Sequence, residues 1–141
     1  MKHLFKFTRE QKLAINSREK NILVSASAGS GKTSVLVERI IKLIIDNKKP
    51  ISVNKILAVT FTDAATWQIK KKISNALREI KNPDDHARRQ AILLNLANIF
   101  TLHAFCLKLV KKYFYLVGID PEFRVPEENV PNNIKKQSLL F

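Results

Sequence analysis

A glycine-rich loop is the segment of this sequence best suited to chemistry. The eight residues expected to hold a nucleotide are Ala26, Ser27, Ala28, Gly29, Ser30, Gly31, Lys32 and Thr33. Gly29 and Gly31 allow the backbone to curl so that successive N–H groups face phosphate oxygens. Lys32 would reach the β- and γ-phosphates of a nucleoside triphosphate, and the Thr33 hydroxyl would ligate Mg²⁺. The sequence therefore predicts a phosphate-binding loop of the relaxed type, with Ala26 in place of the first glycine.

The alternative interpretation of this segment is a Gly-Ser-Gly linker in front of a helix. An apolar run at 21–26 precedes the loop, and a stretch with helical spacing follows it. A strand, a glycine-rich loop and a helix in that order form the context that phosphate binding requires. The context favours the nucleotide site over the linker.

The elements that must position this loop alternate along the chain. Short apolar runs at 21–26 and 55–61 predict strands buried on both faces, and 98–101 is a shorter third candidate. Helical spacing predicts further elements, at 8–17, 32–45, 69–80, 86–96 and 102–117. Strand and helix in alternation predict an α/β fold with a parallel sheet and flanking helices.

Charge and composition narrow the class of protein. With 25 Lys and Arg against 12 Asp and Glu, the net charge is +13, which implies a polyanionic partner. No apolar run approaches the ~20 residues that span a bilayer, so we expect a cytoplasmic protein without a membrane partner. The single cysteine, Cys106, excludes an internal disulfide framework and is expected in the core.

Four segments together resemble a known family. They lie in the order and spacing of the Q motif, motif I, motif Ia and motif Ib of superfamily 1 helicases, at 7–11, 26–33, 56–65 and 101–106. Three further segments resemble AddA-type helicase–nuclease subunits of the UvrD/RecB-like group, at 36–41, 88–95 and 113–116. The resemblance implies a P-loop NTPase with a RecA-like parallel sheet, of which the sequence holds only the first part of the 1A domain.

The resemblance also implies a division of the chain. Residues 1–120 would be the start of the UvrD-like ATP-binding domain, and residues 121–141 a connector and the truncated start of a further helix. The family's activity is ATP-dependent unwinding and processing of double-strand DNA ends in recombinational repair. The implied cofactors are ATP and Mg²⁺. The implied partners are DNA, preferably single-stranded, the remainder of the helicase–nuclease, and its partner subunit.

Individual site residues follow from the matched motifs. Gln11 would read the adenine edge, because its amide offers a donor and an acceptor together. Phe61 would stack on a base of single-stranded DNA, and the Thr62 hydroxyl would hold a phosphate. His103 would touch the DNA backbone or bracket the site. In isolation, Gln11 would be an exposed helix residue, Phe61 a strand-end core aromatic and His103 a structural histidine.

Three departures from the family pattern bear on DNA contact. Asp63 stands where family members usually carry Asn, and its carboxylate would repel DNA phosphate. Thr66-Trp67-Gln68 replaces the usual small-small-acidic stretch. Trp67 is large for the start of a helix packed on a sheet; base stacking and relaxed sequence constraint both remain as interpretations.

The sequence names no catalytic residue. A motor of this class needs a strand that ends in Asp-Glu, and no apolar run here does. We therefore expect the chain to be inactive alone. The alternative is a stand-alone or decayed P-loop nucleotide-binding protein without helicase activity. Basic clusters at 70–72 with Arg78, and at 108–112, would either neutralise phosphates or form solvated helix faces.

Overall fold

The computed structural model describes residues 7–18, 21–80, 84–120 and 122–123. The chain divides into two compact units, Met1–Phe105 and Cys106–Phe141. The expected connector at 121–141 falls almost wholly outside the described residues. Among the described residues, no helix is both long and apolar enough to cross a membrane.

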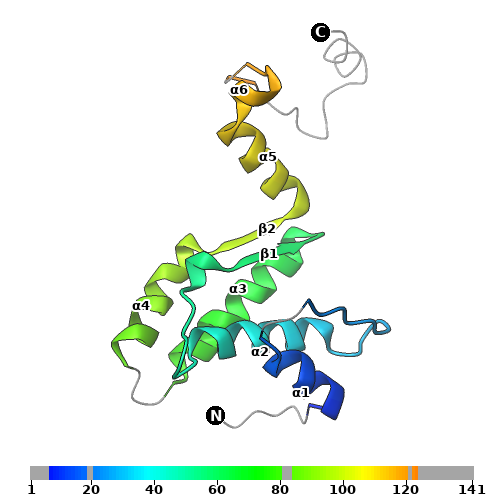
Figure 1. The fold of residues 1–141 in the computed structure, drawn as a ribbon, viewed down its shortest axis with the longest axis vertical. Coiled ribbons are helices and arrows are strands. Elements are labelled where there is room, and N and C mark those ends of the chain that lie inside the picture. The colour runs from blue at the N-terminus through cyan, green and yellow to red at the C-terminus, as the bar shows by residue number, and fades with distance from the viewer. Residues whose placement is uncertain (1–6, 19–20, 81–83, 121, 124–141) are drawn as a thin grey trace. The chain divides into compact units, whose positions relative to one another are not determined.

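The first unit is a mixed α/β structure (Figure 1). Its elements in chain order are α1 (Arg9–Asn16), α2 (Lys32–Ile44), the 3-10 turn η1 (Val53–Lys55), β1 (Leu57–Thr60), α3 (Asp63–Arg78), α4 (Asp85–Leu93), the 3-10 turn η2 (Leu94–Leu96), β2 (Asn98–Thr101) and the start of α5 (Leu102–Lys112). The strands pair in parallel, with Ala58 opposite Ile99 and Thr60 opposite Thr101. The parallel pair is confirmed, as are the expected helices at 8–17, 32–45, 69–80 and 86–96.

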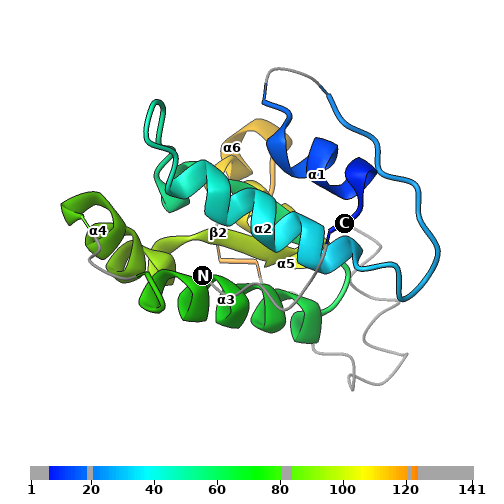
Figure 2. The same ribbon diagram turned by 90° about the horizontal axis from the view of Figure 1, so that it is seen from below.

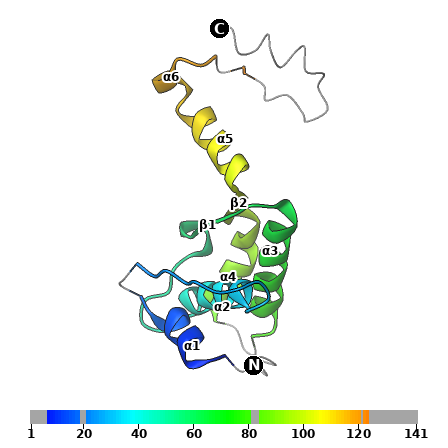
Figure 3. The same cartoon turned by 90° about the vertical axis from the view of Figure 1, so that its right-hand side faces the viewer.

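Helix packing follows the apolar stripes. α3 lies against both strands and runs beside α2, while α1 packs against α2 (Figures 2 and 3). The core cluster contains Val37, Ile40, Ile41, Ile44, Val53, Ala58, Ile69, Ile73, Leu77, Leu94, Ala97 and Ile99. These side chains come mainly from α2, α3 and the strands, so the helix that follows the glycine-rich loop is anchored along its length.

The expected strand at 21–26 is wrong for this structure. These residues lie in irregular conformation, and Leu23 is 95% exposed. A cavity of about 600 Å³, lined in part by Ile22, Val24 and Val59, lies between this segment and β1. A strand exists only where a neighbour takes its N–H and C=O groups, and across this gap β1 offers none.

Burial of the sheet also differs from the expectation. Ala58 and Ile99 are buried, whereas Leu57 and Val59 remain 50% and 42% exposed. Burial alternates along the strands because α2 and α3 cover only one face of the sheet. The prediction of strands buried on both faces is therefore wrong.

In the described part of the second unit, no residue is buried. The stripe at 102–117 predicts one helix, but the structure breaks it into α5 and α6 (Phe114–Val117), which ends at Gly118 with φ of +65°. Phe114 and Tyr115 make an edge-to-face contact with ring centroids 5.8 Å apart. Cys106 is exposed, so its expected core position is wrong: neither helix buries a residue.

Candidate nucleotide-binding site and neighbouring surface

The glycine-rich loop leads directly into the N-terminus of α2. Gly29 and Gly31 have φ of +78° and +84°, a conformation that L side chains rarely adopt. Gly31 is the residue before the first turn of α2, and no side chain caps that turn. The free N–H groups of the helix start and the helix dipole therefore remain available to an anion.

Lys32 lies folded over the loop. Its Nζ donates hydrogen bonds to the carbonyl oxygens of Ala26 and Ser27, both at 2.6 Å. These are neutral acceptors, and a phosphate oxygen would be a stronger, charged partner for the same ammonium group. The contacts place the cation at the mouth of the loop.

Ser30 supplies a second unsatisfied group in the loop. Its Oγ is shielded from solvent, and no described residue forms a hydrogen bond with it. An orphaned buried hydroxyl costs free energy until it finds a partner. Together with Lys32, it gives the loop donors that suit a phosphate, so the residues present fit the implied nucleotide.

Gln11 joins the first helix to this loop. Its Nε2 donates to the carbonyl oxygen of Ser30 at 3.1 Å, and its Oε1 accepts from the Thr8 N–H at 2.9 Å. The Thr8 hydroxyl in turn accepts from the Gln11 N–H, which completes a capping box at the start of α1. The Thr-x-x-Gln spacing is a sequence signal for this cap, which was not among the roles expected for Gln11.

Two cavities meet at Lys32. One of about 390 Å³ is lined by Gln11, Ser30 and Lys32, together with apolar side chains of residues 22–24. The cavity of about 600 Å³ is lined by Lys32 and Thr33 on one side and by Phe61 and Thr62 on the other. The structure therefore brings together the loop, Gln11 and the residues that follow β1.

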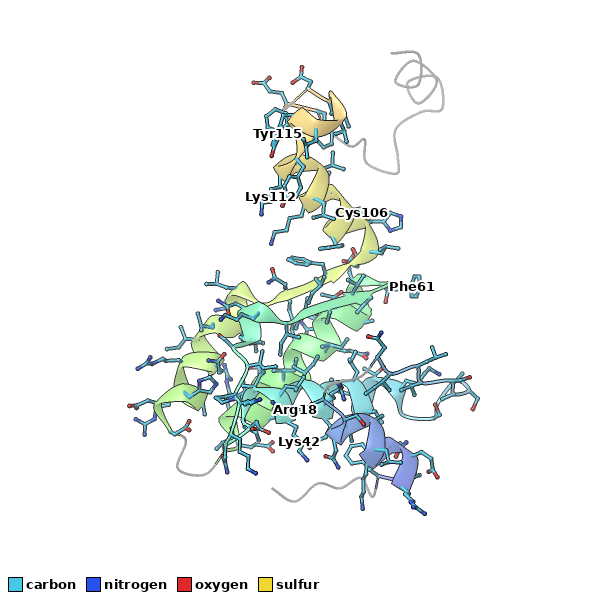
Figure 4. All side chains as sticks on the ribbon, viewed as in Figure 1. Arg18, Lys42, Phe61, Cys106, Lys112 and Tyr115 are labelled. Carbon is cyan, nitrogen blue, oxygen red and sulfur yellow. The ribbon has the colours of Figure 1, made fainter. Side chains whose placement is uncertain are left out.

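Phe61 is not a core aromatic. It is 90% exposed, and Figure 4 shows its ring extending away from the end of β1. This contradicts the alternative of a strand-end core residue. An apolar ring of this exposure has its flat faces accessible to a stacking partner.

Thr62 has a structural role beyond the one expected from its motif. Its hydroxyl accepts a hydrogen bond from the Ala65 N–H at 3.2 Å and so caps α3. Thr66, one of the departures from the family pattern, forms a hydroxyl–hydroxyl hydrogen bond of 2.6 Å with Thr60. That bond ties the first turn of α3 to the end of β1, so Thr66 has a local structural role here.

His103 emerges from the same edge of the sheet as Phe61 and Thr62. Because Thr60 lies opposite Thr101 in the parallel pair, the residues that follow both strands leave the sheet at one end. His103 is exposed in the first turn of α5 and lines neither cavity at Lys32. The structure therefore brings it to the edge but not into the cavities.

Comparison with known proteins decides the family. The model of the UvrD/REP helicase N-terminal domain matches residues 7–140. The chain belongs to the UvrD-helicase family. The resemblance carried by the four motifs is thereby confirmed, and the two-stranded parallel sheet with its helices is consistent with this domain.

Curated relatives, each named as an ATP-dependent helicase/nuclease subunit, narrow the comparison. The chain is 47% identical over 137 residues to the relative from Clostridium perfringens, covering 95% of this chain and 11% of the relative. Over 125 residues it is 49% identical to the relative from Bacillus licheniformis, covering 86% and 10%. The relative from Thermoanaerobacter sp. is 48% identical over 126 residues, covering 87% and 10%. The chain thus spans about a tenth of the length of these relatives.

Proposed function

We propose that residues 26–33 bind ATP with Mg²⁺, as part of an ATP-dependent DNA helicase/nuclease. The observation that carries the proposal is the position of Lys32, whose ammonium group lies over a loop with two left-handed glycines at the start of a helix. A triphosphate would replace two neutral carbonyl acceptors with charged oxygens. The names of the relatives, which include the words ATP-dependent, support the same ligand.

Other residues take roles around the triphosphate. The Ser30 hydroxyl donates to a phosphate oxygen, and the Thr33 hydroxyl ligates Mg²⁺. Gln11 keeps one amide proton and one carbonyl lone pair beyond its bonds to Ser30 and Thr8, and with these it would read the adenine edge. Mg²⁺ held by the Thr33 hydroxyl would neutralise part of the phosphate charge.

The whole protein, in this proposal, unwinds and processes double-strand DNA ends in recombinational repair together with a partner subunit in the cytoplasm. Phe61 stacks on a base of single-stranded DNA, the Thr62 hydroxyl donates its proton to a phosphate, and His103 contacts the backbone. Thr62 can do this while capping α3, since its oxygen accepts there and its proton is free for a further partner.

Hydrolysis by the isolated chain is expected to stay at background. In the described sheet, β1 continues into Phe61-Thr62 and β2 into Leu102-His103, so neither strand ends in the acidic pair that holds Mg²⁺ in this class of motor. ATP turnover with and without single-stranded DNA tests this point. A DNA-stimulated rate that Lys32→Ala abolishes would contradict it.

Thermal unfolding with added ligand tests the binding itself. A ligand that binds only the folded chain stabilises it by about 2.7 kcal/mol at a hundred times its Kd. ATP–Mg²⁺ should raise the Tm of the wild-type chain and of Lys12→Ala, a matched control on the exposed side of α1. In Lys32→Ala the increase in Tm should be lost. AMP, which lacks the phosphates that Lys32 reaches, should raise the Tm of the wild type only slightly. Equal increases in Lys32→Ala and the wild type would overturn the proposal.

A further inference from the structure

A basic groove with one tryptophan lies on the outer face of α3. The inner face of this helix is formed by Ile69, Ile73 and Leu77, all buried in the core. The groove has a volume of about 450 Å³ and is lined by Trp67, Lys70, Lys71, Ser74, Asn75, Arg78, Leu94 and Asn95. It is separate from both cavities at Lys32, with which it shares no residue.

The charge of the groove has one sign. Lys70, Lys71 and Arg78 line it, and no carboxylate does. Within the described part of the chain, none of these three cations forms an ion pair with Asp or Glu. A surface of this kind attracts a polyanion, and its affinity falls as salt rises.

Trp67 adds an exposed aromatic ring to the groove, which a merely solvated basic face would not require. Its side chain is 61% exposed, although an exposed indole leaves a large apolar area in water. The Lys71 Nζ lies 4.5 Å from the centroid of the ring, one helical turn away. The cation–π contact holds the ring on the groove and places a positive charge beside it.

The polar residues of the groove fit bases as well as phosphates. Ser74, Asn75 and Asn95 carry hydroxyl and amide groups that can donate to and accept from base edges. Aromatic side chains beside cations in an open groove are the usual platform for single-stranded nucleic acid, because every base has a flat face to stack. A duplex hides those faces, and an acidic polypeptide has none.

We propose that this groove binds single-stranded nucleic acid, with one base stacked on Trp67 and the flanking phosphates on Lys70, Lys71 and Arg78. The proposal rests on the DNA binding proposed above, and it adds a contact separate from Phe61. Trp67 follows the first turn of α3, whereas Phe61 precedes the helix. The departure of Trp67 from the family pattern thereby gains a function.

The experiment uses the only tryptophan of the chain as its own probe. Tryptophan emission of the full 141-residue chain is titrated with oligothymidylate, with a duplex of equal length, with inorganic polyphosphate and with polyglutamate. Stacking on Trp67 should quench the emission with oligothymidylate alone. Polyphosphate should bind without quenching, since it supplies charge and no bases.

Variants of Trp67 and Phe61 separate the groove contact from the proposed DNA contact at Phe61. Trp67→Ala should lower the affinity for oligothymidylate by about 5- to 150-fold, the equivalent of about 1–3 kcal/mol per stacked base, and should leave polyphosphate affinity unchanged. Trp67→Phe, which keeps a stacking ring, should recover most of the loss. Phe61→Ala retains the tryptophan and should keep the quenching. Circular dichroism of each variant checks that it is folded.

Two kinds of result would overturn the inference. Single-strand binding that depends on Phe61 but leaves Trp67 emission unchanged would overturn it while the proposed DNA contact at Phe61 stands. Equal quenching by polyglutamate, with equal affinity, would assign the groove to an acidic protein partner instead. Loss of ATP binding in Lys32→Ala bears on neither outcome, because the groove shares no residue with the phosphate loop.

Discussion

The Nε2 atom of Gln11 lies 3.1 Å from the carbonyl oxygen of Ser30, so a single side chain ties the first helix to the phosphate loop. The same side chain completes the capping box of α1 through Thr8. The position of the loop and the stability of the helix are therefore coupled at one residue. Substitutions at Gln11 and Thr8 can separate the two effects.

Gln11→Ala removes both contacts, whereas Thr8→Ala removes the cap and leaves the bond to Ser30. We expect Gln11→Ala to weaken ATP binding by about 2- to 12-fold, the equivalent of one hydrogen bond. Thr8→Ala should lower the free energy of unfolding by about 1 kcal/mol with ATP affinity nearly unchanged. Calorimetric titration and urea unfolding measure the two quantities. An equal loss of ATP affinity in both variants would mean that Gln11 acts only through the cap.

Substitution of Thr62 should lower the stability of the folded chain, apart from any effect on DNA binding. Thr62→Ala removes the cap on the Ala65 N–H and should lower the free energy of unfolding by about 1 kcal/mol. Thr62→Ser keeps the hydroxyl and should lose much less. Chemical unfolding of both variants is the measurement; identical stability of the wild type and Thr62→Ala would show that the cap contributes nothing.

Asp63 lies in the first turn of α3, next to the proposed DNA contact, and Glu79 caps the other end of the same helix. Asp63→Asn should tighten binding of single-stranded DNA by about 0.2–1 kcal/mol, because it removes a surface charge that repels phosphate. Glu79→Gln changes the net charge equally and serves as the matched control. Fluorescence anisotropy at moderate salt compares them, and equal tightening in both would indicate an effect of net charge alone.

Asp46 predicts a pH dependence of stability. Hydrogen bonds from the Lys49 and Lys48 N–H groups, each 2.8 Å, lower the pKa of this carboxyl below its ordinary value of 3.8, and Arg18 adds to the effect. Because the folded pKa is depressed, the stabilisation is present above the unfolded pKa and is lost as pH falls through the folded one. Asp46→Asn should therefore be less stable than the wild type at neutral pH, with a difference that shrinks in acid.

Arg18→Gln is the control for that prediction. It removes the ion pair, whose Nη2–Oδ2 distance is 2.9 Å, but keeps both backbone hydrogen bonds to Asp46. It should retain most of the pH dependence. Urea unfolding across the acid range measures the free energy of unfolding of each variant. A stability difference between the wild type and Asp46→Asn that does not change with pH would contradict the role of the Asp46 carboxylate.

Much of the fold could be predicted because periodicity reports burial. The stripes of α2 and α3 supply seven of the core residues, whereas the alternating burial of β1 and β2 was not predicted from their continuous apolar runs. The segment at 21–26 could not be predicted correctly, because an apolar run specifies a tendency to pair but not the presence of a neighbour. The prediction that Cys106 lies in the core was wrong for a similar reason. An apolar stripe indicates which face of a helix would be buried, but α5 buries no residue.

The geometry of the loop was predictable where backbone chemistry demands particular residues. Gly29, Gly31 and Lys32 occupy the loop as expected, since positive φ and a flexible cation leave few alternatives. The bond between Gln11 and Ser30 spans 19 residues and depends on how α1 packs against α2, which no local pattern encodes. The pairing of Trp67 with Lys71 was visible as i, i+4 spacing, but its exposure needed the structure.

Direct titration of ATP–Mg²⁺ into the chain tests the central claim, that the loop at 26–33 is a nucleotide site held by Lys32. Calorimetry should show saturable binding to one site in the wild type and in the control Lys12→Ala. Lys32→Ala should show none, because the loop then lacks the cation that now lies 2.6 Å from the Ala26 and Ser27 carbonyl oxygens. Equal affinity of the wild type and Lys32→Ala for ATP–Mg²⁺ would contradict the account.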